Sequence, residues 1–219
     1  MEDLPFRDRT RAGQVLAKKL AAYSDRTDVI VLALPRGGVP VGHEVAKALR
    51  APLDVFLVRK LGVPGQEELA MGAIAMGGIR VLNDEVVKLL HIDPHDIESV
   101  AAKEGRELAR RDRLYRGARP RPNVEGNTVI LVDDGLATGA TMRAAVAALR
   151  QQGPTRIVVA VPVAAVQTCR ELAGEVDELV CCCTPEPFYS VGYWYEDFSQ
   201  APEQEIRELL ERAVPSPAT

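Results

Sequence analysis

Short apolar runs that end in turn residues alternate with helical periodicity along most of the chain. The first run is DVIVLAL at residues 28–34, closed by PRGG, and a helical stretch to about residue 50 separates it from LDVFLV at residues 53–58. Strand, turn, helix and strand in this order predict a βαβ unit with a parallel pair of strands. From residue 128 the pattern resumes with three further strands, TVILVDD, RIVVAVP and ELVCCC. Because these three runs are almost continuously apolar, we expect helices on both faces of their sheet.

The helical segments are amphipathic. The first opens after Asp8, a residue suited to capping a helix N-terminus, and carries apolar residues at helical spacing from Ala12 to Tyr23. Further helices are expected at about residues 141–152, 166–173 and 203–213. The pattern therefore predicts an α/β fold with a doubly wound, mainly parallel sheet of about five strands.

The middle of the chain departs from this rhythm. Residues 61–80 are rich in Gly and alternate weakly, which favours a hairpin or a mobile loop over a core strand. Residues 83–121 are polar and helical with few large apolar side chains. We therefore expect a single domain over residues 1–219 with an insertion, or hood, at 61–121. The tail at 215–219 has the composition of a disordered segment.

Composition and charge narrow the class of partner. With 219 residues and 47% hydrophobic content, the chain can build one well-buried core. A net charge of -4 argues against a general nucleic-acid binder, although a small anionic ligand needs only a few local cations. No apolar run approaches the roughly 20 residues that cross a membrane, and the N-terminus does not resemble a signal peptide. We therefore expect a cytoplasmic protein without a membrane partner.

The cysteines resemble neither a disulfide framework nor a zinc site. Cys181, Cys182 and Cys183 are consecutive, and Cys169 stands apart. We expect all four to be reduced, with the triplet at the end of a buried strand.

The segment with the clearest chemistry is VILVDDGLATGATM at residues 129–142. It combines an apolar strand, the acid pair Asp133 and Asp134, a turn of small residues and the start of a helix. In an open parallel sheet, ligands bind beyond the carboxyl ends of the strands, so both carboxylates are expected to face the site. The simpler alternative is that the acids only cap the helix and Gly139 only turns the chain.

The turn after the acid pair has the properties of a phosphate site. Its amides converge at a helix N-terminus, where the helix dipole also favours an anion, and its hydroxyls can donate further hydrogen bonds. A sugar attached to a phosphate held there would lie over the two aspartates. Neither the GxxxxGK loop of P-loop hydrolases nor the GxGxxG dinucleotide motif is present. The residues of the turn are Ala137, Thr138, Gly139, Ala140 and Thr141.

Residues 129–142 closely resemble the 5-phosphoribosyl 1-pyrophosphate (PRPP) binding motif of type I phosphoribosyltransferases. The resemblance implies that Asp133 and Asp134 contact the ribose 2- and 3-hydroxyls and that the turn from Ala137 to Thr141 holds the 5-phosphate. Many members of the family carry Thr where this chain has Ala137, but the adenine-type enzymes also read ATG at this point.

A second loop resembles another part of the same family's site. LPRGGV at residues 34–39 is similar to the pyrophosphate loop, and basic residues after the next strand often reach the same group. The resemblance also implies a cis peptide bond between Pro35 and Arg36. The alternative is an ordinary turn with exposed cations. The residues implied in pyrophosphate binding are Arg36, Gly37, Gly38, Arg59 and Lys60.

The function implied is transfer of phosphoribose from PRPP to a nitrogen acceptor, such as a nucleobase in nucleotide salvage, with release of pyrophosphate. Asp133, Asp134, Arg36 and Lys60 are the catalytic candidates. Magnesium is expected to be held mainly by ligand oxygens near Asp133 and Asp134, without a dedicated set of protein ligands. The alternative is a regulator or sensor that binds PRPP without transfer, although the basic residues favour the enzyme.

An aromatic segment follows the last predicted strand. Six of the ten aromatic residues lie in FYSVGYWYEDF at residues 188–198. The candidates for holding a planar acceptor are Tyr193, Trp194, Tyr195 and Glu196. The same rings could equally cover the sheet or form a homodimer contact. The Arg-rich stretch from Lys103 to Arg121 is either a solvated helix face or a lid, and His91 and His95 have no assigned role.

Overall fold

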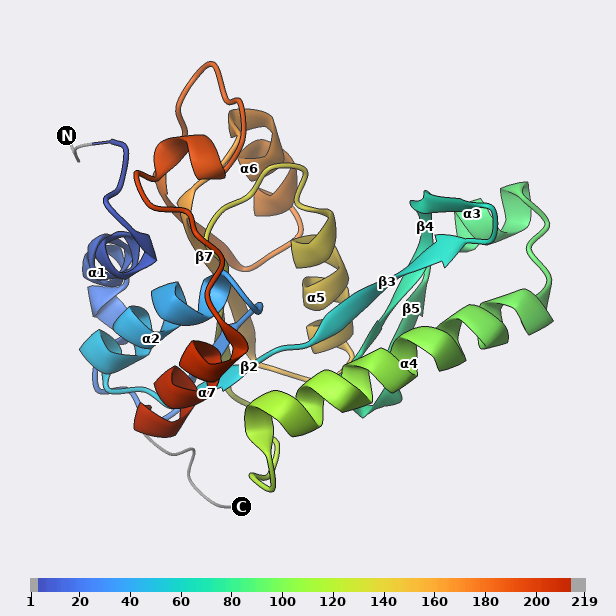
Figure 1. Cartoon of the computed structure of the whole chain (residues 1–219), viewed down its shortest axis with the longest axis horizontal. Helices are drawn as coiled ribbons and strands as arrows, with labels where there is room; N and C mark the ends of the chain where they lie inside the picture. Colours follow the sequence, from blue (N-terminus) through green and yellow to red (C-terminus); the bar gives the residue numbers. More distant parts are fainter. Residues whose placement is uncertain (1–3, 214–219) are drawn as a thin grey trace.

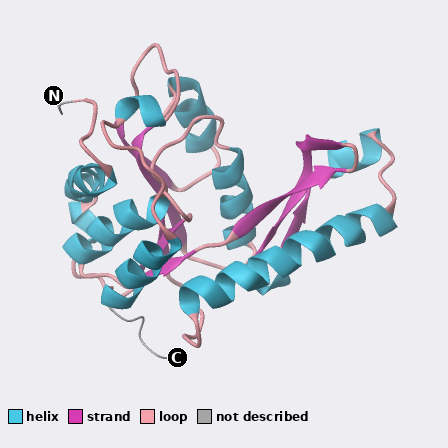
Figure 2. Ribbon diagram, viewed as in Figure 1, coloured by secondary structure: helices cyan, strands magenta, loops and turns pink. Residues whose placement is uncertain are grey.

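A five-stranded parallel sheet forms the centre of the computed structural model, which describes residues 4–213 (Figures 1 and 2). The strand order is β2-β1-β6-β7-β8, and every neighbouring pair is parallel. The predicted fold class is therefore confirmed, whereas the tail at 215–219 lies outside the described residues. The strands are β1 (Val29–Ala33), β2 (Leu53–Val55), β6 (Thr128–Val132), β7 (Arg156–Val163) and β8 (Glu178–Cys183).

Helices cover both faces of this sheet, as the apolar strands predict. All residues of β1 and β6 are buried, so neither face of these central strands meets solvent. Helices α1 and α2 lie on one side of the sheet and α5 on the other (Figure 1). The helices of this body are α1 (Arg9–Lys19), α2 (Gly38–Leu49), α5 (Ala140–Arg150), α6 (Val166–Ala173) and α7 (Glu203–Arg212).

The first helix begins where the sequence predicts. The Asp8 carboxylate accepts a hydrogen bond of 2.7 Å from the Arg11 amide, one of the donors that a helix N-terminus leaves free. Ala12, Val15 and Leu16 are buried on the face that packs on α2 and the sheet. Capping and apolar spacing thus fix both the start of α1 and its orientation.

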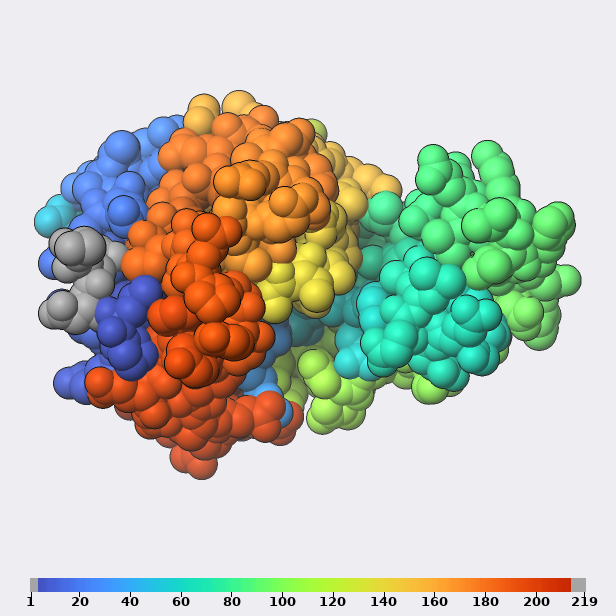
Figure 3. Space-filling view, turned by 90° about the horizontal axis from the view of Figure 1, so that it is seen from above, coloured from blue at the N-terminus to red at the C-terminus, as the bar shows by residue number. Residues whose placement is uncertain are grey.

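The insertion forms an arm that extends away from the central sheet (Figures 1 and 3). Its antiparallel sheet has the order β3-β4-β5, and the predicted hairpin is confirmed. The hairpin turns at Pro64 and Gly65, where the φ of 76° at Gly65 suits a Pro-Gly turn. The elements of the arm are β3 (Val58–Val63), β4 (Gln66–Ala75), η2 (Met76–Gly78), β5 (Arg80–Leu82), α3 (Asp84–Leu89) and α4 (Pro94–Arg116).

One expectation about the start of this region is wrong. The run LDVFLV at residues 53–58 is not one strand: β2 ends at Val55, and Val58 already belongs to the second sheet. The buried side chains of Phe56 and Leu57 make the run apolar although they lie in the crossing between the sheets. The Gly-rich segment forms strands of the hairpin, and two of its side chains, Leu61 and Met71, are fully buried in the main core.

The cysteine triplet ends β8, but that strand is not buried as expected. Because β8 is an edge strand, all six of its residues keep partial contact with solvent. No disulfide joins the four cysteines, all of which lie within residues 4–213. Over the same described range, no helix combines the length and apolar character needed to span a bilayer.

Candidate functional site

The two motifs found separately in the sequence lie side by side at the carboxyl ends of β1 and β6. The Leu34 amide donates a 2.9 Å hydrogen bond to the Val132 carbonyl, which continues the pairing of the strands into the loops. A Cβ on Gly38 would lie 2.7 Å from that same carbonyl oxygen. The LPRGG loop therefore approaches the acid pair so closely that a side chain at this position would collide with the strand end.

Gly37 contacts the acid pair itself. A Cβ at this position would overlap the carboxylate of Asp134. The expected cis peptide between Pro35 and Arg36 is present. The Arg36 side chain makes no hydrogen bond or ion pair with any of the residues that the structure describes, so its charge is available to a ligand. Arg36 is near Tyr115 at the C-terminal end of α4. Burial raises the pKa of the Tyr115 hydroxyl, and the positive charges of neighbouring arginines, including Arg36, oppose that rise.

Replacing Gly37 by alanine is expected to disturb both loops at once. Because the new methyl group would displace the Asp134 carboxylate, we expect Gly37→Ala to lower the free energy of unfolding by about 1–3 kcal/mol. Urea denaturation measures this quantity. The matched control is Gly105→Ala on α4. The new Cβ would lie 3.6 Å from Ile74 Cδ1, an ordinary van der Waals distance, and the substitution should stabilise the helix by up to about 1 kcal/mol. Equal stability of the two variants would contradict the close contact at Gly37.

The two acids have different environments. Asp133 accepts a 2.8 Å hydrogen bond from the Asp134 amide, whereas Asp134 accepts one of 2.8 Å from Arg9 Nε. Burial, followed by the Asp134 charge, raises the pKa of Asp133 well above its ordinary value. Burial also raises the pKa of Asp134, although the hydrogen bond from Arg9 opposes this effect. The Tyr195 hydroxyl donates 2.6 Å to the Asp134 carbonyl and fixes the backbone between the acids and the turn.

The turn after the acid pair has its amides at the start of α5. Gly139 adopts a φ of 72°, which favours glycine, and a Cβ there would lie 2.8 Å from Thr168 Cγ2. The first amide of α5 with a helical acceptor is that of Arg143, which donates 2.9 Å to the Gly139 carbonyl. The amides before it have no partner within the helix, as at any helix N-terminus.

The carbonyls of the same turn are held from behind. Thr168 on α6 donates its hydroxyl to the Ala137 carbonyl, and Arg143 donates a 2.9 Å hydrogen bond to the Thr138 carbonyl. Because these carbonyls are engaged within the protein, the peptide groups of the turn are oriented without a ligand. Such a fixed turn suits an anion at its amides.

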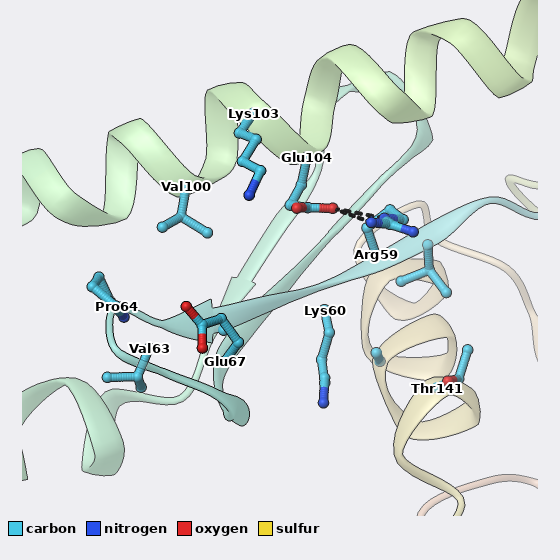
Figure 4. Close-up of a pocket in the computed structure, with 12 residues that line it drawn as sticks. Arg59, Lys60, Val63, Pro64, Glu67, Val100, Lys103, Glu104 and Thr141 are labelled. Atoms are coloured by element: carbon cyan, nitrogen blue, oxygen red, sulfur yellow. Dashed lines mark hydrogen bonds and ion pairs between the residues drawn. The ribbon is translucent and has the colours of Figure 1, made fainter.

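A cavity of about 430 Å³ lies between the start of α5 and the arm (Figure 4). Thr141 lines one side, and Arg59 and Lys60 of β3 line the other. Arg59 reaches across to Glu104 of α4 with an Nη2 to Oε2 distance of 2.6 Å, whereas Lys60 extends from β3 toward the side of α5. A smaller adjoining cavity lies between Pro35, Arg59 and Thr141. The LPRGG loop, the start of α5 and the start of β3 thus border two cavities that share Val58, Arg59 and Thr141 as lining residues.

A phosphoribosyl transferase domain model matches residues 8–183, which include the two loops, the acid pair and the whole arm. The chain belongs to the type I phosphoribosyltransferase family. This assignment confirms the resemblance seen in residues 129–142.

Two Mycobacterium tuberculosis proteins named as candidate phosphoribosyl transferases, from strains CDC 1551 and H37Rv, are 48% identical to this phosphoribosyltransferase chain over 208 residues. The match covers 95% of the chain and 47% of each relative, so the chain spans about half the length of the curated relatives it matches. The crystal structure of TT1426 from Thermus thermophilus is 42% identical with a TM-score of 0.86 and covers 95% of this chain and 99% of that one. A hypoxanthine-guanine phosphoribosyltransferase from Bacillus anthracis, 10% identical with a TM-score of 0.50 over 85% of this chain and 86% of that one, shares the fold.

The aromatic segment lies beside the acid pair, but its members differ in exposure. Tyr193 is 59% exposed and packs against Tyr189 with ring centroids 5.0 Å apart. Tyr195 is buried, and its ring packs on Phe6 while its hydroxyl bonds the Asp134 carbonyl. Tyr193 is therefore accessible to a ligand, whereas Tyr195 is buried and holds the backbone at Asp134.

The other two acceptor candidates flank Tyr195. The indole Nε1 of Trp194 is buried and has no hydrogen-bond partner among residues 4–213. Glu196 is exposed, and its amide donates 2.8 Å to the Phe6 carbonyl, which pairs the N-terminal segment with the aromatic segment. The backbone of the aromatic segment is thus fixed at Glu196, while the Glu196 side chain remains at the surface.

Three side chains that touch the phosphoribosyltransferase motifs carry no local sequence signal. Arg9 bonds Asp134 from a helix 125 residues away in the chain, and Thr168 and Arg143 bond carbonyls of the turn before α5. Their residue types are ordinary for amphipathic helices. Only the position of Arg9 directly after the helix cap at Asp8 could have suggested that it is held at a defined place.

Proposed function

We propose that this chain binds PRPP with magnesium and transfers its phosphoribosyl group to a nitrogen acceptor. The observation that carries the proposal is the contact of the LPRGG loop with the acid pair, one turn before the helix N-terminus of α5. In this assignment Asp133 and Asp134 bind the ribose hydroxyls, and the turn from Ala137 to Thr141 binds the 5-phosphate. The LPRGG loop binds the pyrophosphate, and Gly37 and Gly38 allow that loop to lie against the acid pair.

In the proposed reaction the bond between ribose C1 and the pyrophosphate oxygen breaks, and pyrophosphate departs with the electron pair. A bond forms between C1 and the acceptor nitrogen, which then loses its proton. The protein contributes by orienting the two reactants, an effect worth about 7–11 kcal/mol in favourable cases. It also supplies cations where negative charge develops on the leaving group.

The available cations support this role. The Arg36 side chain makes neither a hydrogen bond nor an ion pair with the described residues. Among the same residues, the Lys60 ammonium makes only a 3.2 Å contact to the Glu68 carbonyl and a 3.5 Å one to its carboxylate. Arg59 is paired with Glu104 and would have to exchange that partner for pyrophosphate. We therefore assign Arg36 and Lys60 to the leaving group first, and Arg59 to a later contact that pyrophosphate gains by displacing Glu104.

The carboxylates fit a magnesium ion that is bound mainly through its ligand. Magnesium prefers oxygen donors and retains several waters. Asp133 uses one oxygen for the Asp134 amide, and Asp134 uses one for Arg9, so each keeps a second oxygen for the ion or the ribose. Within residues 4–213 no cluster of three or more His, Cys, Asp or Glu side chains is arranged to hold a metal. When bound, the ion would neutralise charge on the pyrophosphate.

The acceptor would lie beside the aromatic segment, where the exposed ring of Tyr193 can stack on a planar base and Glu196 can accept its amino hydrogens. Trp194 and Tyr195 are less exposed than Tyr193, and they would support the acceptor site without lying at its surface. A nucleobase acceptor would put the reaction in nucleotide salvage.

The test is pyrophosphate release from PRPP and magnesium in the presence of separate purines, pyrimidines and simple amines. Release that depends on one acceptor class supports the proposed transfer and identifies the acceptor. Tight donor binding without pyrophosphate release from any acceptor would instead indicate a regulator or sensor. Absence of donor binding in calorimetry would overturn both functions.

A further inference from the structure

Arg9 is a basic residue outside both motifs that contacts the acid pair directly. Its Nε donates to Asp134 Oδ2 at 2.8 Å, and its Nη1 donates to the Ser199 carbonyl at 2.7 Å. Its guanidinium carbon lies 4.0 Å from the centroid of the Phe198 ring. Only 12% of its side chain is exposed. The guanidinium is thus held by a carboxylate, a carbonyl and an aromatic face at the same time.

The same side chain lies beneath the pyrophosphate loop. A Cβ at Gly37 would meet both the Asp134 carboxylate and Arg9 Nε, the latter at 3.2 Å. Arg9 therefore connects the LPRGG loop, the acid pair and the segment that follows the aromatic residues. These three pieces are far apart in the sequence, and the guanidinium lies against all three.

We propose that Arg9 is the positioning residue of the donor site, because its fixed contact with Oδ2 of Asp134 leaves Oδ1 as the oxygen that meets the ribose. The inference rests on the proposed function, since it assigns a role within PRPP binding. Arg9 does not touch the ligand in this assignment. It acts through Asp134, whose carboxylate would otherwise rotate and lose a defined direction.

The fork of the guanidinium explains why arginine suits this position. Two nitrogens donate in different directions, one to Asp134 and one to Ser199, and a lysine ammonium at the end of a flexible chain cannot hold both contacts with the same geometry. Arg9→Lys should therefore retain the charge beside Asp134 but lose part of the orientation. This difference separates positioning from simple charge neutralisation.

The experiment compares PRPP affinity in the presence of magnesium, measured by isothermal titration calorimetry on the full chain. Arg9→Ala is expected to bind about tenfold more weakly than the wild type, the loss typical of one charge-assisted hydrogen bond, and Arg9→Lys to fall between them. The matched control is Arg11→Ala, an exposed arginine two residues along α1 whose side chain makes no hydrogen bond or ion pair with the described residues. That control should bind PRPP like the wild type.

A double-mutant cycle distinguishes positioning from a purely structural role. If Arg9 acts through Asp134, Arg9→Ala should cause no further loss of affinity in the Asp134→Asn background. An equal additional loss in that background, or unchanged affinity of Arg9→Ala, would overturn the inference while leaving the proposed function intact. If Arg9→Ala does not fold, the same cycle with Arg9→Lys supplies the answer. Failure of the wild type itself to bind PRPP would reject the proposed function, and the inference with it.

Discussion

Converting both Asp133 and Asp134 to asparagine is expected to weaken PRPP binding by at least about a hundredfold. Each carboxylate would lose a charged hydrogen bond to a ribose hydroxyl, worth about 1.5–3 kcal/mol, and two such losses correspond to a factor of about 10² to 10⁴. Asparagine has nearly the same shape, so the approach of Gly37 and the loop path should persist. Calorimetric titration of PRPP with magnesium measures the change.

The stability of this double variant should move much less than its affinity. Burial raises the pKa of both acids, which means that the fold holds their charged forms at a cost. Removing those charges relieves that cost and offsets the weaker contact to Arg9, so we expect the free energy of unfolding to change by about 1 kcal/mol or less. A collapse of stability would make any loss of binding uninformative about the acids.

A control with the same change in net charge is available in the arm. Asp84 and Asp96 are exposed on α3 and α4, and their side chains bond no described residue. The double variant Asp84→Asn and Asp96→Asn should bind PRPP like the wild type. Equal affinities of the two double variants would refute the assignment of Asp133 and Asp134 to the ribose.

Those parts of the site that are built from one short stretch of sequence could be predicted, because the residues of that stretch alone determine the local structure. The strand before Asp133, the helix after Gly139 and the small residues between them are adjacent in the chain, so strand and helix geometry place them without knowledge of the rest of the fold. The same holds for LPRGG, whose glycines are explained by the close approach of the β6 strand end and the Asp134 carboxylate.

Contacts between distant segments could not be predicted in this way. Arg9 and Asp134 are 125 residues apart, and the pairing of Arg59 with Glu104 depends on how the arm folds back over β3. The end of β2 could not be predicted either. Phe56 is buried in the segment that crosses between the two sheets, and this burial produces the same apolar pattern as a strand. Sequence patterns report burial and period, and neither reveals which elements will meet.

The arm itself is anchored by a buried ion pair, and breaking it should cost the most stability of any single change considered. Arg116 at the end of α4 donates from Nε to Asp54 Oδ2 of β2 at 3.1 Å and from Nη1 to Asp112 Oδ1 at 2.6 Å. Only 2% of the Arg116 side chain is exposed. Arg116→Met is expected to lower the free energy of unfolding by about 3–5 kcal/mol, because it leaves a buried carboxylate without its cation. Urea denaturation at equilibrium measures the loss.

The cost should fall on Asp54 rather than on Asp112. Asp112 keeps a second cation, since Arg121 Nη2 donates to it at 2.7 Å. Among residues 4–213, the Asp54 carboxylate retains only the Val55 amide at 2.7 Å. Adding Asp54→Asn to Arg116→Met removes the unpaired charge while preserving an acceptor for that amide, and should recover part of the lost stability.

The matched control is Arg113→Met, one turn earlier on α4, where the arginine is exposed and its side chain bonds no described residue. Arg113→Met should change the free energy of unfolding by no more than about 0.5 kcal/mol. A similarly small effect of Arg116→Met, or no recovery in the double variant, would show that the buried pair does not hold the arm to β2. Because the arm carries Lys60 and Glu104 to the cavity, a variant with a loosened anchor should also bind PRPP more weakly than Arg113→Met at temperatures where both remain folded.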